Sequence, residues 1–594
     1  MTFSYGLADA LTALPNTVAS NQTEVAQLDL YDERLFAVTA SGWSAHLPDP
    51  STTRHMVNMF FKFNVYANHL FHAPTFLASL NLHPMDPRFP PVGILHAICA
   101  LGSLYTAEKS HTSMYTDLGF PYIAVNGRWA KRPVRALPFS VHHCRLAWLA
   151  LAKYFESGDH LLEETQTNIL LTLFDMYRAS WVDVFRNSGE ALRSTVPLGL
   201  CTCPPFKIRR PPLGTAGPIV QDPMILPPPE SATDEELRRN IFWLTYILDR
   251  QQSISRDLAL ALDDRDIGQL LPVRGDYFHY GLTIPIEERQ WSTDPDLLLR
   301  HPPQHTDSFI LYVKSAILIT RVKNFNVRYR GRYYSGDPSM RTCDNTSNDP
   351  FVEDVAQQRK LLDDLKHLDP RGTQAFEELD TLLLSFRTSL PTQFTMPVKN
   401  GRVDALLYSV LIVSHLATIL LHDPHVNLDD PACPSRIKLL QASQGILELI
   451  YLISSTSYDV SLLDHFAISG WYFAGREIAR FLRSAIRCNN AGDIITHCAE
   501  LNDIHTILGK AGKLLSTAHQ YQRILTDVIS QTCGEQYVPG QTSWTSVPPA
   551  ALPESQLTTM GMRSLARTTY TQGPGEVGVV SLLDESSRGQ VTLA

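Results

Sequence analysis

Two acidic motifs in this sequence come close to the spacing that holds magnesium on a diphosphate through carboxylate oxygens. The first is Asp263-Asp264-Arg265-Asp266, and the second is Asn502-Asp-Ile-His-Thr506. Ile267 stands where the first motif needs another carboxylate, and Lys510 stands where the second needs a closing glutamate. A lysine in a ligand position repels a cation, so neither motif is expected to bind magnesium. The aspartates at 263, 264 and 266 are expected to cap a turn instead.

Cysteine and histidine spacings do not predict a metal centre. Cys201 and Cys203 are one residue apart and have no second pair nearby, whereas structural zinc sites usually use Cys-x2-Cys pairs. The histidines at 142 and 143, and those at 301 and 305, lack a third ligand at usable spacing. The sequence also has no glycine-rich phosphate loop, nucleophile elbow or His-Glu-x-x-His motif. It therefore predicts no catalytic residue, no cofactor-binding residue and no metal ligand.

The most strongly patterned segment follows a proline-rich stretch over 204–229, which holds too many prolines for a regular element. Apolar residues then recur every three or four positions, the period of an amphipathic helix, at Leu237, Ile241, Leu244 and Leu248. Thr233 and Glu236 have the spacing of a capping box. A helix is therefore expected to open at Ser231 and to run to about Gln252.

Helical periodicity continues over most of the chain, and strand signals are scarce. The other expected helices cover about 56–66, 71–77, 94–105, 141–155, 165–179, 182–196, 307–328, 376–389, 403–421, 435–456, 462–487 and 494–530, with another beginning near Phe351. The predicted fold class is therefore all-α, a large multi-helix array.

Composition divides the chain into four expected parts. Residues 1–55 are polar and aperiodic and predict a mobile N-terminal arm. Residues 56–330 form the core of the array, and 351–530 continue it after a break rich in glycine, asparagine and aspartate. Residues 533–594 are rich in Ser, Thr, Gly and Pro and predict a disordered tail.

Overall composition indicates a globular protein of a reducing compartment. The 594 residues are 44% hydrophobic and 19% charged, with a net charge of −9, which argues against a protein that coats nucleic acid. Two short basic clusters, 128–135 and 207–210, are interpreted as loops or an import signal. Nine scattered cysteines indicate no disulfide framework. Because no basic leader and no run of about 18 apolar residues occur, a soluble intracellular protein without a membrane partner is expected.

The expected helix and the turn after it also carry a recognisable order of residues. Arg238-Arg239, Trp243 and Asp249-Arg250 are followed by Asp266-Ile-Gly-Gln-Leu-Leu-Pro272. This order resembles the signature of the fungal-specific transcription factor regulatory domain, the middle homology region of zinc-cluster transcription factors. Three earlier segments match in order and spacing, namely Phe71-His-Ala-Pro-Thr-Phe76, the helix at 94–103, and 189–200 with Arg193 and Gly199. All of these signature residues are interpreted as structural.

The sequence departs from that family at the zinc cluster. The cluster needs six cysteines in two Cys-x2-Cys-x6-Cys runs, because two zinc ions share the thiolates. The first cysteine here is Cys99, already inside the expected helices. The cluster and its zinc are therefore expected to be missing, either because this is a truncated product or because the regulator works through a partner protein.

The resemblance implies a nuclear regulator of RNA polymerase II-dependent gene expression rather than an enzyme. Its implied partners are the transcription machinery and DNA, the latter reached only through the missing module or another protein. A homodimer and a small-molecule effector held between helices are further hypotheses. The alternatives are a helical interaction scaffold without a transcriptional role and, less favoured, a magnesium-dependent enzyme of the terpene synthase type.

Overall fold

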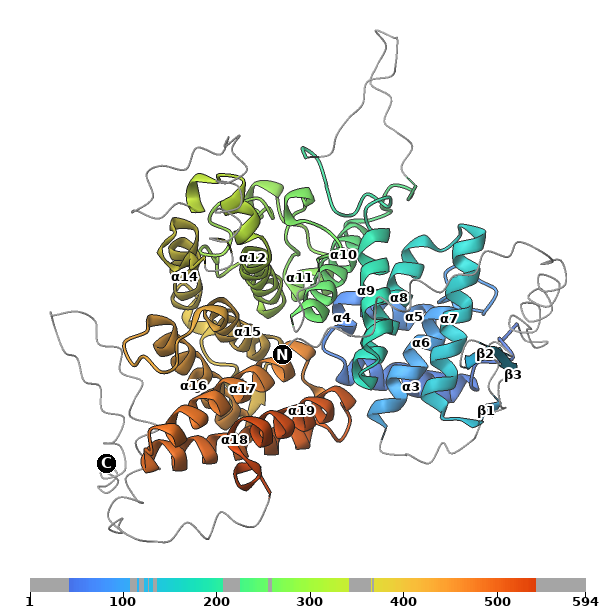
Figure 1. Cartoon of the computed structure of the whole chain (residues 1–594). Coiled ribbons are helices and arrows are strands. Elements are labelled where there is room, and N and C mark those ends of the chain that lie inside the picture. The colour runs from blue at the N-terminus through green and yellow to red at the C-terminus, as the bar shows by residue number, and fades with distance from the viewer. Residues whose placement is uncertain are drawn as a thin grey trace, which may run out of the picture. The chain divides into compact units, whose positions relative to one another are not determined.

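The computed structural model describes residues 42–106, 137–206, 225–254, 259–340, 365 and 368–540, together with short strands between 115 and 137 (Figure 1). These residues are predominantly helical, which confirms the all-α prediction. Most of the expected N-terminal arm and tail, the basic residues at 207–210, and the helix expected near Phe351 lie outside the described residues.

The first helices include one small helix that is buried at every residue but its first. They are α3 (Pro50–Phe63), α4 (Ala67–Leu70), α5 (Ala73–Ser79), α6 (Val92–Gly102), α7 (Phe139–Ser157), α8 (Leu161–Arg178) and α9 (Trp181–Ser194). Helix α6 contacts α3, α7 and α8, and a Cβ at Gly102 would collide with the carbonyl of Met56. Small residues in α6 therefore permit the close approach of its neighbours.

Helix α3 begins earlier than the periodicity predicts. Asp49 caps it, since its Oδ1 accepts from the backbone N–H groups of Ser51 and Thr52 at 3.0 and 3.1 Å. Pro50 occupies the first helical position, where its missing N–H is not needed.

The remaining helices are α10 (Ala232–Ser253), α11 (Gly275–Tyr280), α12 (Ser308–Tyr334), α14 (Gln374–Thr388), α15 (Ala405–His422), α16 (Pro434–Ser454), α17 (His465–Arg487), α18 (Ala491–Ala511) and α19 (Ser516–Cys533). Antiparallel strand pairs join β1 (Tyr115–Thr116) to β4 (Ala136–Leu137), β2 (Tyr122–Val125) to β3 (Arg128–Lys131), and β5 (Val398–Lys399) to β6 (Arg402–Val403). The basic cluster at 128–135 thus begins in β3.

The prediction of one continuous helix over 494–530 was wrong. Helix α18 ends at Ala511, and the chain turns before α19 begins at Ser516. A Cβ at Gly512 would lie 3.1 Å from the Cβ of His519, so the glycine allows the two helices to meet closely. Apolar periodicity is the same on both sides of this turn, and only the glycine signals it.

One helix passes the length and apolarity test for a membrane span, although the sequence predicted none. This segment, Ala405–His425, comprises α15 and the turn after it, and 72% of its most apolar window is buried. Helix α15 packs against α12, α16 and α17, so its apolar side chains are covered by other helices of the same fold.

A buried histidine pair joins α6 to α7. The Nδ1 atoms of His96 and His143 lie 2.9 Å apart, so one ring must donate and the other accept. Burial depresses both pKa values, that of His143 to about 3. Neither ring is therefore charged at neutral pH.

Acid is therefore expected to weaken this packing. A histidine with a depressed folded pKa stabilises the fold above its unfolded pKa of about 6.5, and this contribution is lost as the pH falls towards the folded value. Each histidine of the pair contributes a slope of up to about 1.4 kcal/mol per pH unit. The free energy of unfolding, measured in urea at pH 7.0, 6.0 and 5.0, should fall less steeply with pH for the double variant His96→Leu/His143→Leu than for the wild type. Equal slopes would contradict this account.

Candidate functional site

Helix α10, which carries most of the signature residues, lies at the centre of the described helices (Figure 1). Every residue from Arg239 to Ser253 is buried, because α4, α8, α9 and α12 all pack against it. The amphipathic pattern predicted one buried face, which was wrong. The capping box was also wrong, since Ser231 accepts from the N–H of Asp234 and Glu236 turns to two arginines instead.

The first polar cluster surrounds the carboxylate of Glu236. Arg239 and Arg289 both pair with it, and Arg239 Nε also donates to Gln269 Oε1 at 3.1 Å. Gln269 in turn donates to the carbonyl of Leu200 at 2.7 Å. The beginning of α10 is thus tied to the segments around 200 and 269, both of which belong to the sequence signature.

Backbone pairing holds those two segments together. The N–H of Cys203 donates to Gly268 O at 2.9 Å, and the N–H of Gly268 donates to Cys201 O at 3.1 Å. Gly199, with a φ of 71°, turns the chain into this pairing. Cys201 and Cys203 therefore belong to a short backbone bridge, with Cys201 buried.

Trp243 links α10 to the same signature turn. Its side chain is fully buried, and its indole Nε1 donates to Leu270 O at 2.8 Å. A buried indole N–H normally needs such an acceptor. The tryptophan and the Asp266–Pro272 segment therefore occur together in the signature because they meet in the fold.

The second polar cluster surrounds Arg250 at the other end of α10. Its Nη1 donates to Asp249 at 2.9 Å, and its Nη2 donates to Leu262 O and Asp264, both at 2.8 Å. The guanidinium also lies 3.7 Å from the centre of the Tyr246 ring. Burial raises the pKa of Asp249, although the charge of Arg250 opposes that shift.

Two of the three aspartates of the first acidic motif have different roles. Asp263 caps the short 3-10 turn Asp264–Asp266 by accepting from the N–H of Arg265 at 3.1 Å, as expected. Asp264 instead pairs with Arg250 and accepts from Tyr246 at 3.0 Å. Among the described residues, no group of three or more His, Cys, Asp and Glu side chains is arranged to hold a metal ion.

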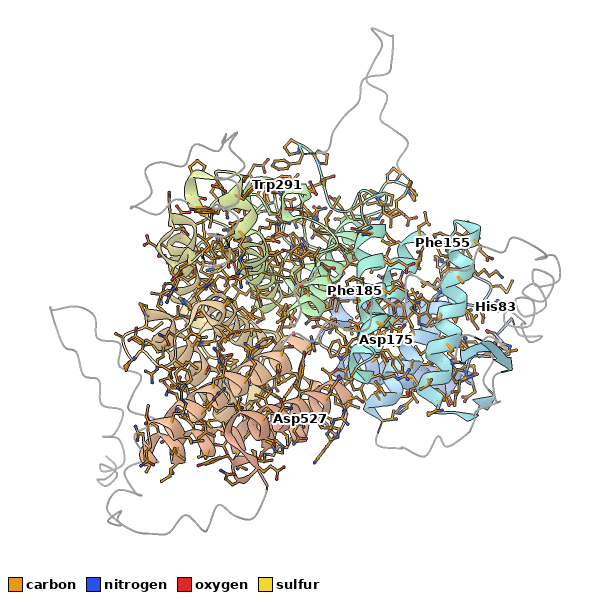
Figure 2. All side chains as sticks on the ribbon, viewed as in Figure 1. His83, Phe155, Asp175, Phe185, Trp291 and Asp527 are labelled. Atoms are coloured by element: carbon orange, nitrogen blue, oxygen red, sulfur yellow. The ribbon has the colours of Figure 1, made fainter. Side chains whose placement is uncertain are left out.

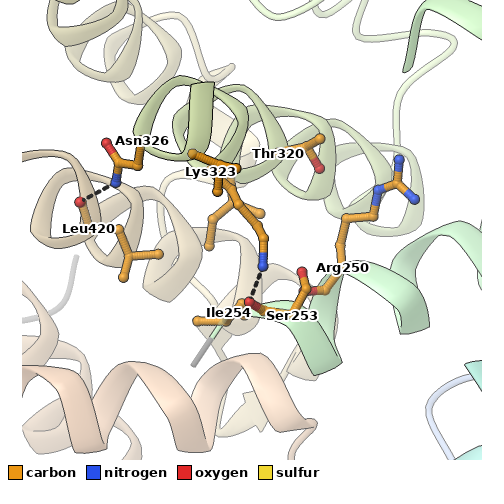
Figure 3. Close-up of a pocket in the computed structure, with 9 residues that line it drawn as sticks. Arg250, Ser253, Ile254, Thr320, Lys323, Asn326 and Leu420 are labelled. Atoms are coloured by element: carbon orange, nitrogen blue, oxygen red, sulfur yellow. Dashed lines mark hydrogen bonds between the residues drawn. The ribbon is translucent and has the colours of Figure 1, made fainter. Parts of the chain in front are cut away.

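A small cavity of about 60 Å³ lies beside the second cluster, between α10, α12 and α15 (Figure 3). Lys323 reaches across it to Ser253 O, and Asn326 donates to Leu420 O at 2.7 Å. Its volume suits a few water molecules rather than an organic ligand.

Two of the signature arginines lie outside both clusters. Arg238 pairs with Asp234 at 2.9 Å and donates to Pro227 O at 2.7 Å, and Arg193 is exposed on α9. The structure thus brings Arg239, Trp243 and Gly199 to one end of α10 and the Asp249–Arg250 pair to the other.

A third buried network, which the sequence analysis missed, connects α10 to the C-terminal helices. Asp464 caps α17 by accepting from the N–H of Ala467 at 3.1 Å and from Ser409 Oγ at 2.6 Å. Its other oxygen accepts from Gln251, at 3.2 Å, and from Tyr66 and Tyr312. An aspartate before a helical pattern signals a cap. Nothing in its local sequence indicates the other four partners.

A serine, histidine and aspartate also line up, at Ser435, His422 and Asp380. Ser435 Oγ lies 3.1 Å from His422 Nδ1, and His422 Nε2 lies 3.1 Å from Asp380 Oδ1. Ser435 is fully buried in the first turn of α16. Its hydroxyl is closed to any substrate in this conformation, so the arrangement ties helices together.

The carboxyl group of Asp175 is set to titrate near neutral pH. Asp175 lies buried in the last turn of α8 and accepts from Asn187 Nδ2 at 2.9 Å (Figure 2). Burial, reinforced by nearby Asp183, raises its pKa to about 7. Its folded pKa exceeds its unfolded value, so its stabilising contribution is present at low pH and is lost as the pH rises through 7.

Asp175→Asn should therefore gain stability relative to the wild type as the pH rises from 5 to 8. The difference in unfolding free energy between the variant and the wild type should change by up to about 2–4 kcal/mol over this range, which is the full effect of the raised pKa. Urea unfolding at pH 5 and pH 8 measures it, with the exposed Asp159→Asn as the matched control. A parallel response of both variants would rule out Asp175 as the titrating group.

Comparisons with known proteins agree with this geometry. The model of the fungal specific transcription factor domain matches residues 57–309. An uncharacterized transcriptional regulatory protein of Schizosaccharomyces pombe is 27% identical over 273 residues, which are 46% of this chain and 24% of that protein. A Zn(2)-C6 fungal-type transcription factor of Fusarium oxysporum is 24% identical over 407 residues, which are 68% of this chain and 38% of that protein.

These matches define how far the similarity extends. The chain spans between 24% and 38% of the length of these two curated relatives. No solved structure matches it. The family match covers the segments that meet around α10, from the helices before it to the first turn of α12. Residues 57–309 of this chain are therefore similar to the fungal specific transcription factor domain.

Proposed function

We propose that this chain is the helical regulatory region of a nuclear regulator of RNA polymerase II-dependent transcription. The observation that carries the proposal is the match over 57–309, whose signature residues meet around α10 in the structure. DNA is reached through a zinc cluster or a partner protein. The helical region acts on the transcription machinery.

The structure suggests how much of the chain such a regulator needs. Asp464 and Ser409 lie beyond the family match, yet they complete a buried network with Tyr66 and Gln251 inside it. Removing the C-terminal helices would leave these buried polar groups without partners, which is unfavourable. The helices up to α19 therefore act together with the matched domain as one regulatory unit.

A tethering experiment tests this function. The full chain is fused to a heterologous DNA-binding domain and placed upstream of a reporter gene in yeast. Reporter output should change several-fold relative to the DNA-binding domain alone, in either direction. The matched fusion carrying Arg250→Met, which disrupts the buried cluster, should lose the effect, whereas Arg238→Met should retain it.

Two measurements make the result interpretable. Immunoblotting establishes that each fusion is present at equal levels, and a fluorescent tag on the unfused chain reports its location. Nuclear accumulation with an altered reporter is the expected outcome. An inert reporter with an excluded, well-expressed chain would overturn the proposal and favour a helical scaffold outside the nucleus.

A further inference from the structure

The outward face of helix α9 carries a row of residues that the fold leaves open, called here the α9 stripe. Val182 is 77% exposed, Phe185 49% and Val196, in the turn after the helix, 45% (Figure 2). Gly189 and the exposed Arg193 complete the stripe. At about 100° per residue, its helical members all point within about 40° of the direction of Gly189. Helices α8 and α10 pack against the buried residues of α9, which lie on its other side.

Gly189 stands at the middle of the α9 stripe, and no neighbour among the described residues requires a glycine there. A Cβ at this position would meet no atom within 4 Å. Glycine inside a helix is unfavourable relative to alanine, and such a glycine usually has a packing or functional reason. Because the space above Gly189 is empty, the backbone of a second helix can approach closely at this point.

The spacing of the α9 stripe is symmetric about Gly189. Successive members are separated by three, four, four and three residues. If two copies of α9 run antiparallel about a twofold axis at Gly189, each member therefore lies level with another member of the α9 stripe. Val182 is then level with Val196 of the second copy, and Phe185 with its Arg193. Twofold dimers need such a self-complementary surface.

The chemistry of the α9 stripe fits this pairing. The guanidinium of Arg193 can lie on the ring of Phe185 from the second copy, as a cation–π contact. Beside the stripe, Arg186 is positioned by Asp183 at 3.2 Å, and antiparallel pairing brings it within two residues of the level of Glu190 in the second copy. Neither Glu190 nor Arg193 forms an ion pair with another described residue. Both charges are therefore available to a second copy.

We propose that this chain forms a twofold dimer through the α9 stripe, with the two helices antiparallel and crossing at Gly189. The occupant is a second copy because the surface matches itself in spacing, in charge and in the room for close approach. One helix from each copy buries less than the about 1,200 Å² of a standard interface, so the dimer is weak. This inference does not rest on the proposed function, since association is measured without DNA or a reporter.

Sedimentation of the purified full chain tests the dimer. Between about 1 and 200 μM the mass should rise from one copy towards two, as is usual for a small interface. Gly189→Leu should weaken association about tenfold or more, because two leucine side chains would meet on the twofold axis at the centre of the interface. The single copy should keep its stability in urea or gain some, since leucine favours a helix and meets no neighbour at this position.

A matched pair of serine variants locates the surface. Phe185→Ser removes the ring that receives Arg193, and it should also weaken association about tenfold. Leu384→Ser replaces an apolar residue of similar exposure, 41%, on α14, which takes no part in the α9 stripe. It should leave the Kd of dimerisation unchanged.

Cysteine crosslinking tests the orientation of the two helices. Under mild oxidation, Gly189→Cys should crosslink to its own copy, because both cysteines then lie at the twofold axis. In the antiparallel dimer the two copies of Val182→Cys are about 21 Å apart along the helix, far beyond the reach of a disulfide. Only the double variant Val182→Cys/Val196→Cys should crosslink there. The wild-type chain gives the background from its own cysteines.

Three results would overturn the proposal. These are a wild-type chain that stays monomeric at the highest concentration, undiminished dimerisation of both Gly189→Leu and Phe185→Ser, or crosslinking of Val182→Cys alone at the rate of Gly189→Cys. The first result would assign the α9 stripe to a different protein. An inert reporter with an intact dimer would reject the transcriptional role alone.

Discussion

Replacing Arg250 by methionine is expected to lower the free energy of unfolding by about 3–5 kcal/mol, the usual loss when one partner of a buried ion pair is removed. The side chains of Arg250 and Asp249 are 1% and 2% exposed, so the substitution leaves a carboxylate in the interior without its cation. Leu262 O and Asp264 lose a donor as well. Urea unfolding followed by far-UV circular dichroism measures the loss.

Arg238→Met is the matched control, because it removes the same group from the same helix. The Arg238–Asp234 pair is more exposed, at 12% and 24%, and such pairs contribute about 1 kcal/mol or less. Arg250→Lys should fall between the two, since lysine keeps the charge but cannot contact Asp249, Asp264 and Leu262 O as a fork. Similar losses in Arg250→Met and Arg238→Met would show that burial does not decide the effect.

The fold class could be predicted because helical periodicity needs only local sequence. The full burial of α10 could not be predicted, because polar residues interrupt its apolar pattern. Asp249 and Arg250 would be placed away from the apolar stripe of an isolated helix, yet both are buried in α10. They are tolerated there because they find partners inside the protein, which a helical pattern does not reveal.

The site was predictable only in part for the same reason. The signature identified Arg239 and Trp243, but their partners lie in other segments. Arg239 meets Gln269 across 30 residues, Glu236 meets Arg289 across 53, and Gln251 meets Asp464 across 213. The spacing of single residues carries no information about contacts at these separations, so the networks required the structure.

Asp464→Ala is the other substitution with a large expected effect, again about 3–5 kcal/mol of unfolding free energy. The carboxylate accepts from Ser409, Gln251, Tyr66 and Tyr312, and it caps α17. Alanine would leave these donors buried without an acceptor and would also remove the cap. Urea unfolding measures the loss, and the exposed Asp493→Ala in α18 controls for general effects of losing a carboxylate.

Asp464→Asn separates hydrogen bonding from charge at the same position. Asparagine still accepts through one oxygen, and Gln251 Oε1, which has no hydrogen-bond partner among the described residues, can accept from the new amide if the glutamine flips. We therefore expect less than half the loss of unfolding free energy seen with alanine.

The same pair of proteins tests the charge of Asp464. Burial raises the pKa of Asp464, so the wild type loses stability as the pH rises through that folded pKa, and the asparagine variant should not. The stability difference between them should consequently move in favour of Asp464→Asn as the pH rises above the unfolded pKa of about 3.9. A difference that is constant with pH would mean that the folded pKa of Asp464 is not raised, and its charge would then have to be accommodated by the five donors alone.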